Sequence, residues 1–198
     1  GKRRVGTFGD LACYSFYPTK NLGGIGDGGA ILTNNKTLAA KIRLLHNGHQ
    51  TSKYYHTAVG QNTRLDELQA AILRVKLAHL DELITKRQQV AAWYDAWLDG
   101  SKVTKPVVRP QVRHVYHLYV IQSKRRDALQ QSLAKEGIVT QVHYPWPLHK
   151  LPAFKSLKKK YRLPMSEQMA RQALSLPMYP GLTQADVRRI CQLVNQAA

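Results

Sequence analysis

Residues 9–33 constrain the fold of this chain more than any other stretch. They begin with a short apolar and aromatic run, residues 11–16, which has the composition of a buried strand. Pro18 ends regular strand pairing because it has no backbone N–H, and Lys20 follows it directly. Five glycines occupy the next nine positions, before residues 30–33 form a second apolar run. The pattern predicts a lysine on a glycine-rich turn between two buried strands.

A lysine in this setting is a candidate nucleophile. Loops held by a rigid scaffold often carry catalytic groups. The neutral amine of lysine adds to an aldehyde to give an imine, and burial favours the neutral form because it lowers the pKa of an amine. Most lysines are solvated charges, however, so a surface role for Lys20 is the alternative interpretation.

Several segments of the chain resemble one known family. They are SFYPTKNLG at residues 15–23, GDGGA at 26–30, GQNTRLDELQAA at 60–71, HYPWPLH at 143–149 and LSLPMYP at 174–180. In sequence and order they are similar to the DegT/DnrJ/EryC1/StrS family of sugar aminotransferases. The resemblance implies pyridoxal 5′-phosphate (PLP) as cofactor and an α/β fold of the fold-type I transferases.

The resemblance also implies a domain organisation. Residues 1–98 would form the C-terminal part of the large PLP-binding domain with a long connecting helix, and residues 99–198 a small C-terminal α/β domain. Chains of this family are about twice as long. Their upstream half supplies a phosphate-gripping loop and an aspartate for the pyridine nitrogen, and neither has a counterpart here. We therefore expect this chain to be the C-terminal half of such an enzyme.

The cofactor-binding residues implied by the resemblance are Lys20, Ser15 and Asn62. Lys20 would form the Schiff base and then carry a proton between substrate and cofactor. The Ser15 hydroxyl would contact the PLP phosphate, although a lone serine more often bonds the local backbone. Asn62 would reach the phosphate bound by the neighbouring subunit of a homodimer, and a turn asparagine is the alternative.

The substrate-binding residues implied by the resemblance are Arg64, His143, Tyr144 and His149. Arg64 would open the long helix, where its charge opposes the helix dipole, and this placement favours a ligand role. His143 and His149 are six residues apart, but no third ligand of suitable spacing accompanies them, so we expect no metal site. Two prolines hold the segment in an extended loop.

The implied function is transfer of an amino group from glutamate to a nucleotide-linked keto-deoxysugar. The SFYPTKNLG segment resembles the branch that acts on 3-keto-6-deoxy sugars, for amino-sugar and polysaccharide biosynthesis. An inactive fragment of such an enzyme is one alternative. A basic nucleic-acid-binding module is the other, because the formal net charge is +18. That charge is scattered, with one lysine triple at 158–160 in an expected loop, and no helix-turn-helix signature or aromatic platform accompanies it.

Composition indicates a reduced, cytoplasmic setting. Cys13 and Cys191 are far apart and show no metal-ligand spacing, and we expect both to be reduced core thiols. We find no signal peptide, and no apolar run approaches the roughly 18 residues of a membrane helix.

The remaining elements follow from periodicity and turn residues. After an N-cap at Asn34 or Asn35 a helix should run to about residue 46, and residues 47–63 should be loop. An apolar stripe predicts one long helix over 64–98, or two joined near His79, before a break at residues 99–101. In the second domain the pattern predicts strands at 115–121 and 138–142, and helices at 125–135, 168–174 and 186–194, the last capped by Thr183.

Overall fold

The computed structural model describes residues 4, 6–157 and 161–198, so the lysine triple at 158–160 lies outside the described residues. Contacts within the chain divide it into two compact units, Gly1–Asp81 and Glu82–Ala198. Each unit combines helices and strands, and each is described by itself. The division into domains at residue 98 stays a prediction.

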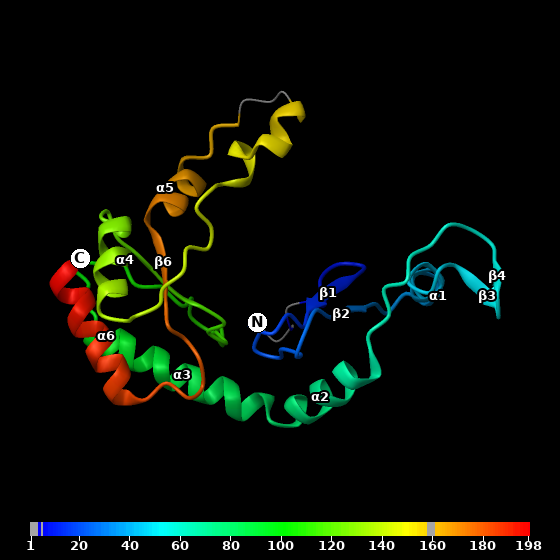
Figure 1. Ribbon diagram of the computed structural model, residues 1–198, viewed down its shortest axis with the longest axis horizontal. Helices are drawn as coiled ribbons and strands as arrows, with labels where there is room; N and C mark the ends of the chain where they lie inside the picture. The colour runs from blue at the N-terminus through cyan, green and yellow to red at the C-terminus, as the bar shows by residue number, and fades with distance from the viewer. Residues whose placement is uncertain (1–3, 5, 158–160) are drawn as a thin grey trace. The chain divides into compact units, whose positions relative to one another are not determined.

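The first unit consists of two short strand pairs and two helices (Figure 1). Its elements are β1 Ala12–Ser15, β2 Gly29–Leu32, α1 Lys36–Leu45, β3 Gln50–Ser52, β4 Tyr55–His56 and α2 Glu67–Ala78. β1 and β2 pair antiparallel, with Ala12 opposite Leu32 and Ser15 opposite Gly29. The hairpin of β3 and β4 falls within the segment predicted as loop, so that prediction was wrong there.

The prediction that β1 and β2 are buried was also wrong. Only Ala12 of β1 is buried, and Tyr14, Ile31 and Leu32 are exposed. The physical reason is that a ribbon of two strands has no further strands beside it, and an isolated pair covers little of its own surface. Cys13 consequently lies exposed on β1, which corrects its assignment to the core.

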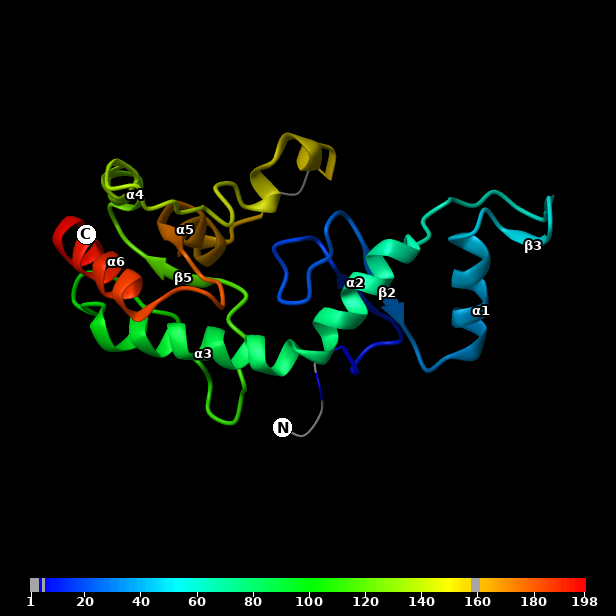
Figure 2. The same ribbon diagram turned by 60° about the horizontal axis from the view of Figure 1, so that its bottom comes forward.

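Local signals predicted the start of α1, whereas α2 begins at Glu67, three residues after the predicted Arg64. Asn35 caps α1, because its side-chain oxygen accepts the Leu38 N–H at 3.1 Å. The long helical pattern is divided at His79 into α2 and α3 Leu80–Trp97, which is the second of the two predicted alternatives. Figure 2 shows α2 lying alongside the loop that joins β1 to β2.

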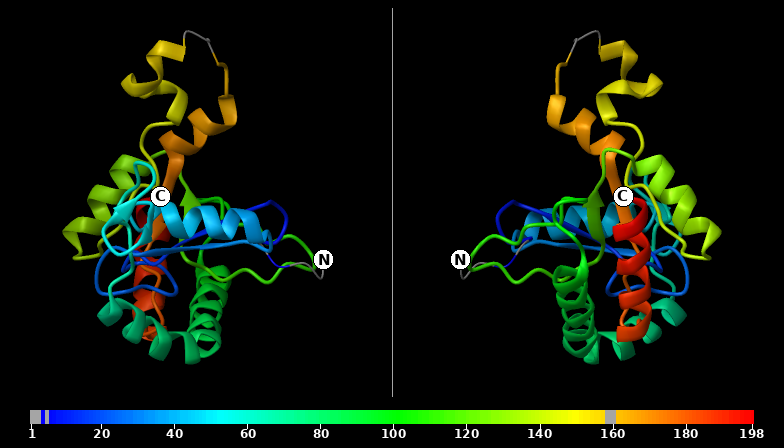
Figure 3. Two further views of the ribbon diagram at one scale, coloured as in Figure 1. Left: turned by 90° about the vertical axis from the view of Figure 1, so that its right-hand side faces the viewer. Right: turned by 90° about the vertical axis from the view of Figure 1, so that its left-hand side faces the viewer.

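The second unit is built around one antiparallel strand pair. β5 Tyr119–Gln122 pairs with β6 Ala173–Leu176, and Tyr119 lies opposite Leu176. Single backbone bridges extend the sheet on both sides, from Thr104 to Gln122 and from Gln141 to Ser175. The other elements are α4 Arg126–Lys135, the 3-10 helices η1 Leu148–Lys150 and η2 Pro152–Leu157, α5 Pro164–Gln172 and α6 Gln184–Ala197. Figure 3 shows η1, η2 and α5 extending away from the sheet, while α4 and α6 lie beside it.

The hydrophobic core of this unit joins both strands to α3, α4 and α6. Its fully buried members include Val90, Tyr94, Tyr119, Ile121, Leu129, Leu133, Leu174, Val187, Cys191 and Val194. The rings of Tyr94 and Tyr119 stack with centroids 4.7 Å apart. Desolvation raises the pKa of both phenols, so they remain neutral hydrogen-bond donors. Their hydroxyls donate to the Pro177 carbonyl and the Asp95 carboxylate.

A buried arginine fixes the loops next to this core. Nη1 of Arg87, on α3, donates to the carbonyl oxygens of Tyr116, His117 and Met178 at 3.0–3.2 Å. Burial lowers the pKa of its guanidinium, yet arginine stays protonated in proteins. The carbonyls at 116 and 117 bond to Arg87 and not to a neighbouring strand. Tyr116 also has a φ of +41°, which is not the extended conformation of a strand. The strand therefore begins at Tyr119, later than the predicted residue 115.

Two further predictions in this unit were wrong. Residues 138–142 contribute only the Gln141 bridge to the sheet, and no strand. Residues 173 and 174, predicted as the end of a helix, belong to β6, because all four β6 residues are buried in pairing with β5. Tertiary pairing thus overrides a local sequence that favours helix.

Termini of the other helices agree with the sequence. Thr183 caps α6 and forms a reciprocal capping box with Asp186. Gly137 follows α4 at a φ of +75°, the conformation that favours glycine after a helix. Among the helices of the described ranges, none combines the length and the apolar character needed to cross a membrane.

The different burial of the two cysteines predicts different reactivity. Burial raises the pKa of the Cys191 thiol to about 12, so little thiolate forms near neutral pH, whereas Cys13 is exposed. We expect a disulfide reagent such as DTNB to modify one thiol in the native chain and two in guanidinium. In Cys13→Ser the native reaction should disappear while one thiol reacts after unfolding. Equal native rates for both thiols would contradict the burial of Cys191.

Candidate functional site

Lys20 lies half-buried in the turn that leaves β1. Its backbone N–H donates to the Tyr17 carbonyl at 2.8 Å, which closes the turn. The turn requires glycine at position 23, because an added Cβ would lie only 2.4 Å from the Pro18 carbonyl oxygen. Lys20 therefore lies between two backbone segments, at Pro18 and at Gly23, that are in very close contact.

Backbone hydrogen bonds close the longer loop around this turn. The Phe16 N–H donates to Gly28 and the Gly24 N–H donates to Phe16, each at 2.8 Å. Both bonds involve Phe16, the residue that follows β1. They continue the pairing of β1 and β2 into the glycine-rich segment, which makes Lys20 part of an ordered loop.

Two side chains of α2 also bond to this loop, and the sequence analysis did not single them out. The Gln69 Oε1 accepts the Ile25 N–H at 2.9 Å, and the Lys76 Nζ donates to the Gly23 carbonyl at 2.7 Å. Gln69 lies within the family-like segment 60–71, which was a signal for its importance. Nothing in the sequence distinguished Lys76 from the other basic residues of the helices.

Ser15 lies five residues before Lys20, at the end of β1. Its Oγ accepts the Tyr17 N–H at 3.3 Å, the local backbone contact that was the alternative interpretation. A hydroxyl that accepts one hydrogen bond still carries its own O–H donor. The geometry is thus compatible with a further bond from Ser15 to an anionic oxygen.

Asn62 and Arg64 lie together on the segment that precedes α2. Asn62 pairs with Asn47 in an isolated backbone bridge, and the Arg64 Nη1 donates to the Asn47 side-chain oxygen at 2.7 Å. The helix begins at Glu67, so Arg64 precedes it and does not open it. The argument from an opposed helix dipole was therefore wrong, since that effect is confined to the terminal turn.

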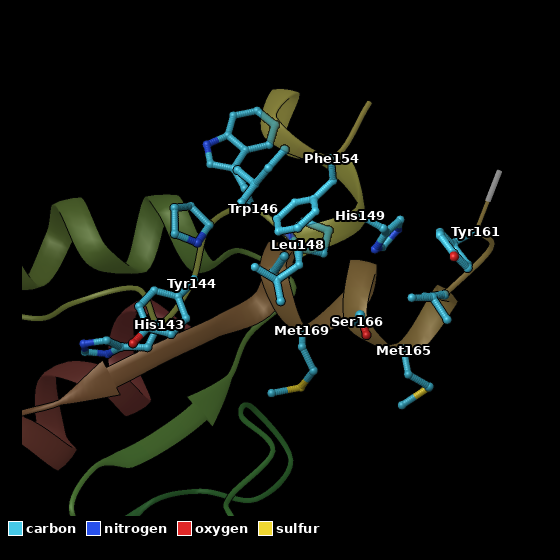
Figure 4. Close-up of a pocket in the computed structure, with 15 residues that line it drawn as sticks. His143, Tyr144, Trp146, Leu148, His149, Phe154, Tyr161, Met165, Ser166 and Met169 are labelled. Carbon is cyan, nitrogen blue, oxygen red and sulfur yellow. The ribbon is translucent and has the colours of Figure 1, made fainter. Parts of the chain in front are cut away.

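The second unit contains the other candidate residues around one large cavity. His143, Tyr144 and His149 line a cavity of about 1030 Å³ together with Trp146, Phe154 and Met169 (Figure 4). The Nδ1 of His143 lies 2.8 Å from the Ser175 Oγ, and Ser175 is buried on β6. Tyr144 and Trp146 are more than half exposed, so the cavity wall presents large aromatic side chains to a ligand.

His149 connects η1 to α5 through a carboxylate. Its Nε2 lies 3.0 Å from the Glu167 Oε1, and its side chain is only 7% exposed. The Lys150 Nζ lies 3.5 Å from the same oxygen. The hydrogen bond from His149 and the charge of Lys150 hold the pKa of Glu167 below its ordinary value of 4.5. Among the described residues, no group of three or more His, Cys, Asp or Glu side chains gathers as metal ligands do.

A family model matches residues 1–195 of the chain. That model describes the DegT/DnrJ/EryC1/StrS aminotransferase family. The chain belongs to this family. The match confirms the resemblance on which the candidate residues were chosen.

Curated relatives of this family include two named sugar aminotransferases. The dTDP-3-amino-3,4,6-trideoxy-alpha-D-glucose transaminase of Streptomyces venezuelae is 42% identical over 99% of this chain and 52% of its own length. The UDP-2-acetamido-2-deoxy-3-oxo-D-glucuronate aminotransferase of Pseudomonas aeruginosa is 44% identical over 96% of this chain and 52% of its own. The chain spans about half the length of the curated relatives it matches.

Solved structures of the family share the fold. The structure of S. venezuelae DesV in complex with a ketimine intermediate matches with a TM-score of 0.91 and 43% identity, over 98% of this chain and 53% of that chain. A DegT DnrJ EryC1 StrS aminotransferase from Brucella abortus matches with a TM-score of 0.89 and 36% identity, over 98% of this chain and 52% of its own. The predicted α/β aminotransferase fold is thereby confirmed.

The contact between His149 and Glu167 predicts a measurable titration. Because the folded pKa of Glu167 is depressed, its stabilising effect is present above pH 4.5 and is lost as the pH falls through the folded value. We expect His149→Leu to move the Glu167 pKa back toward 4.5, as followed by NMR of its side-chain carboxyl carbon. Glu136, an exposed glutamate of the same unit, serves as the control. An unchanged Glu167 titration in His149→Leu would contradict the contact.

Proposed function

We propose that this chain supplies the lysine-bearing part of a PLP-dependent aminotransferase site, which moves an amino group from glutamate to a nucleotide-linked keto-deoxysugar. One observation carries the proposal: Lys20 lies on a closed, glycine-rich turn after β1, within a chain that belongs to this aminotransferase family. A solvated surface lysine would not need backbone contacts as close as those at Gly23.

The residues present fit part of the cofactor. Lys20 offers the amine, and Ser15, five residues earlier at the end of β1, offers a hydroxyl donor. Bound PLP supplies an electron sink for cleavage of the bond at the amino-bearing carbon. Lys20 would hold the cofactor through its amine and, once released, move the proton between substrate carbon and cofactor. Ser15 would donate to a phosphate oxygen, and Asn62 would contact the phosphate in a neighbouring subunit.

The cavity of the second unit would receive the sugar nucleotide. His143 and His149 would form hydrogen bonds with it, and each imidazole is oriented by a bond to Ser175 or Glu167. Tyr144 would add an aromatic surface and a hydroxyl. Arg64 would pair with an anionic group of the substrate. Aminotransferases of this kind act on charged substrates, and a formal net charge of +18 favours their approach.

The relatives favour amination at carbon 3. The Streptomyces relative is named for a dTDP-3-amino sugar, and the Pseudomonas relative for a UDP-linked 3-oxo sugar. A third relative, from Acidithiobacillus ferrooxidans and 38% identical, is named for UDP-N-acetyl-3-dehydro-alpha-D-glucosamine. We therefore propose a nucleotide-linked 3-keto sugar, with the 6-deoxy form as the first substrate to assay.

Lys20 can be tested by chemical trapping. In the longest polypeptide that contains these 198 residues, borohydride reduction after loading with PLP should leave a pyridoxyl label on Lys20, identified by peptide mass mapping. Lys20→Arg should abolish transamination while keeping the charge, because arginine is not deprotonated to a nucleophile. Lys86→Arg, an exposed lysine of α3, is the matched control. Recovery of the label on another lysine would end the assignment.

The 198-residue chain alone gives the companion measurement. We expect it to show no turnover with glutamate and a nucleotide-linked 3-keto sugar. The electron sink needs a carboxylate at the pyridine nitrogen, and the aspartates near Lys20, Asp10 and Asp27, are exposed and do not match the family's motif. Sustained turnover by a monodisperse monomer would overturn this expectation.

The proposed role of Asn62 predicts a shared site in a homodimer. Lys20→Ala and Asn62→Ala subunits should each lack activity, and mixing them should regenerate some activity in hybrid dimers with one intact site. Recovery is measured after co-expression with two affinity tags, so that the hybrid is isolated before the assay. An inactive hybrid of verified composition would count against a site shared between subunits.

A further inference from the structure

We propose that Gln69 and Lys76 of α2 are positioning residues for Lys20. They would hold the glycine-rich loop, and through it the lysine amine, in the orientation that the reaction requires. The inference rests on the proposed function of Lys20, and it adds a role for a helix that carries none of the candidate site residues. Both anchors come from far along the chain, 44 and 53 residues from the atoms they hold.

Gln69 lies against the loop through its carboxamide. Its Oε1 accepts the Ile25 N–H at 2.9 Å. A Cβ added at Gly24 would lie 2.5 Å from Oε1, and one added at Gly26 would lie 2.7 Å from Nε2. The amide therefore occupies the space that side chains would fill at both positions flanking Ile25. The Gln69 amide can therefore occupy this position because residues 24 and 26 are glycines.

Lys76 holds the loop at a second point. Its Nζ donates to the Gly23 carbonyl at 2.7 Å, in a half-buried setting where a charged donor strengthens the bond. Gly23 is also the residue at which an added Cβ would lie 2.4 Å from the Pro18 carbonyl oxygen, at the far end of the turn that contains Lys20. Lys76 consequently bonds to the same peptide segment that closes the lysine turn.

The two anchors are seven residues apart on one helix, which corresponds to roughly 10 Å along its axis. They hold two points of the loop, the Ile25 N–H and the Gly23 carbonyl, and two contacts restrain the loop more than one contact would. The Leu65 side chain, just before α2, lies beside Gly28, where an added Cβ would be 3.0 Å from the Leu65 Cδ1. The pairing of β1 and β2 is exposed and short, so α2 supplies restraint that the ribbon lacks.

Restraint of this kind acts on chemistry through geometry. The amine of a flexible lysine must meet one carbon atom in a narrow range of directions, and a misplacement of about 1 Å can cost a factor of 10² in rate. Loosening the loop should lower kcat with little change in KM for glutamate, because neither anchor is placed to touch the amino donor. It should also change the acid–base behaviour of the lysine-bound cofactor, which reports the surroundings of the amine.

The test uses near-isosteric variants in the longest polypeptide that contains this chain. Gln69→Leu removes the acceptor, Lys76→Met removes the charged donor, and Gln69→Glu retains an acceptor oxygen for the Ile25 N–H. Matched controls are Gln89→Leu on α3 and Arg74→Met on α2, both at exposed positions. The readouts are amide hydrogen exchange of residues 20–26, the pH titration of the visible absorbance of bound cofactor, and kcat with KM.

We expect amide exchange at Ile25 to accelerate about 10-fold in Gln69→Leu, the equivalent of one lost hydrogen bond, while Ile121 in the second unit is unchanged. Gln69→Glu should restore most of this protection. In Gln69→Leu and Lys76→Met kcat should fall about 10-fold or more and the cofactor titration should shift, with both controls like wild type. A variant that fails to fold is replaced by Gln69→Asn or Lys76→Gln, whose shorter polar side chains also lose the contact, and the same fall in kcat is expected.

The outcomes separate this inference from the proposed function. If exchange accelerates at Ile25 while kcat and the cofactor titration match the controls, the anchors are structural and the positioning role is overturned. Unchanged exchange in both Gln69→Leu and Lys76→Met would overturn the anchoring itself. If wild type carries no borohydride-fixed label on Lys20, the proposed function fails, and the positioning role fails with it even where exchange confirms the anchoring.

Discussion

The approach of backbone to backbone at the glycine-rich loop is the constraint on which the candidate site depends. A Cβ at Gly23 or Gly29 would lie less than 3 Å from a main-chain oxygen, and at Gly24 and Gly26 it would meet the Gln69 amide. Contacts this close allow only glycine, and they bring the loop within hydrogen-bonding distance of α2. A loop rich in glycine is usually flexible, but here the missing side chains permit the contacts that order it.

Polar contacts from helices recur in the second unit. Arg87 of α3 gathers three carbonyls from two loops, and Glu167 of α5 holds His149. In each case an ionisable side chain on a helix fixes a segment that has little regular structure of its own. The buried strand pair supplies the hydrophobic core, and these contacts determine where the loops at its edges lie. The aromatic cavity is therefore lined by exposed side chains on a backbone segment that such a contact holds in place.

The sequence predicted features whose cause is local. The caps at Asn35 and Thr183 and the stop at Gly137 depend on a few neighbouring residues, and each appeared in the structure. The junction at His79, one of the two alternatives for residues 64–98, appeared as well. Errors arose where distant residues decide the outcome. Residues 173 and 174 form a strand because β5 lies beside them, and Cys13 is exposed because, within the described ranges, β1 pairs with β2 alone.

The candidate site likewise combines features with local causes and features that depend on distant residues. The position of Lys20 followed from Pro18 and the glycines that surround it, and the family match supports the segment as a whole. Of its two anchors, Gln69 lies in the family-like segment 60–71, whereas Lys76 could not be predicted, because it is one of 30 basic residues and only the fold brings it to Gly23. From composition alone, Lys76 would be assigned to a solvated helix face, whereas in the structure its Nζ donates a hydrogen bond to the Gly23 carbonyl. The excess of positive charge therefore need not indicate an anionic partner at every position, since part of it is used to hold carbonyl oxygens inside the chain.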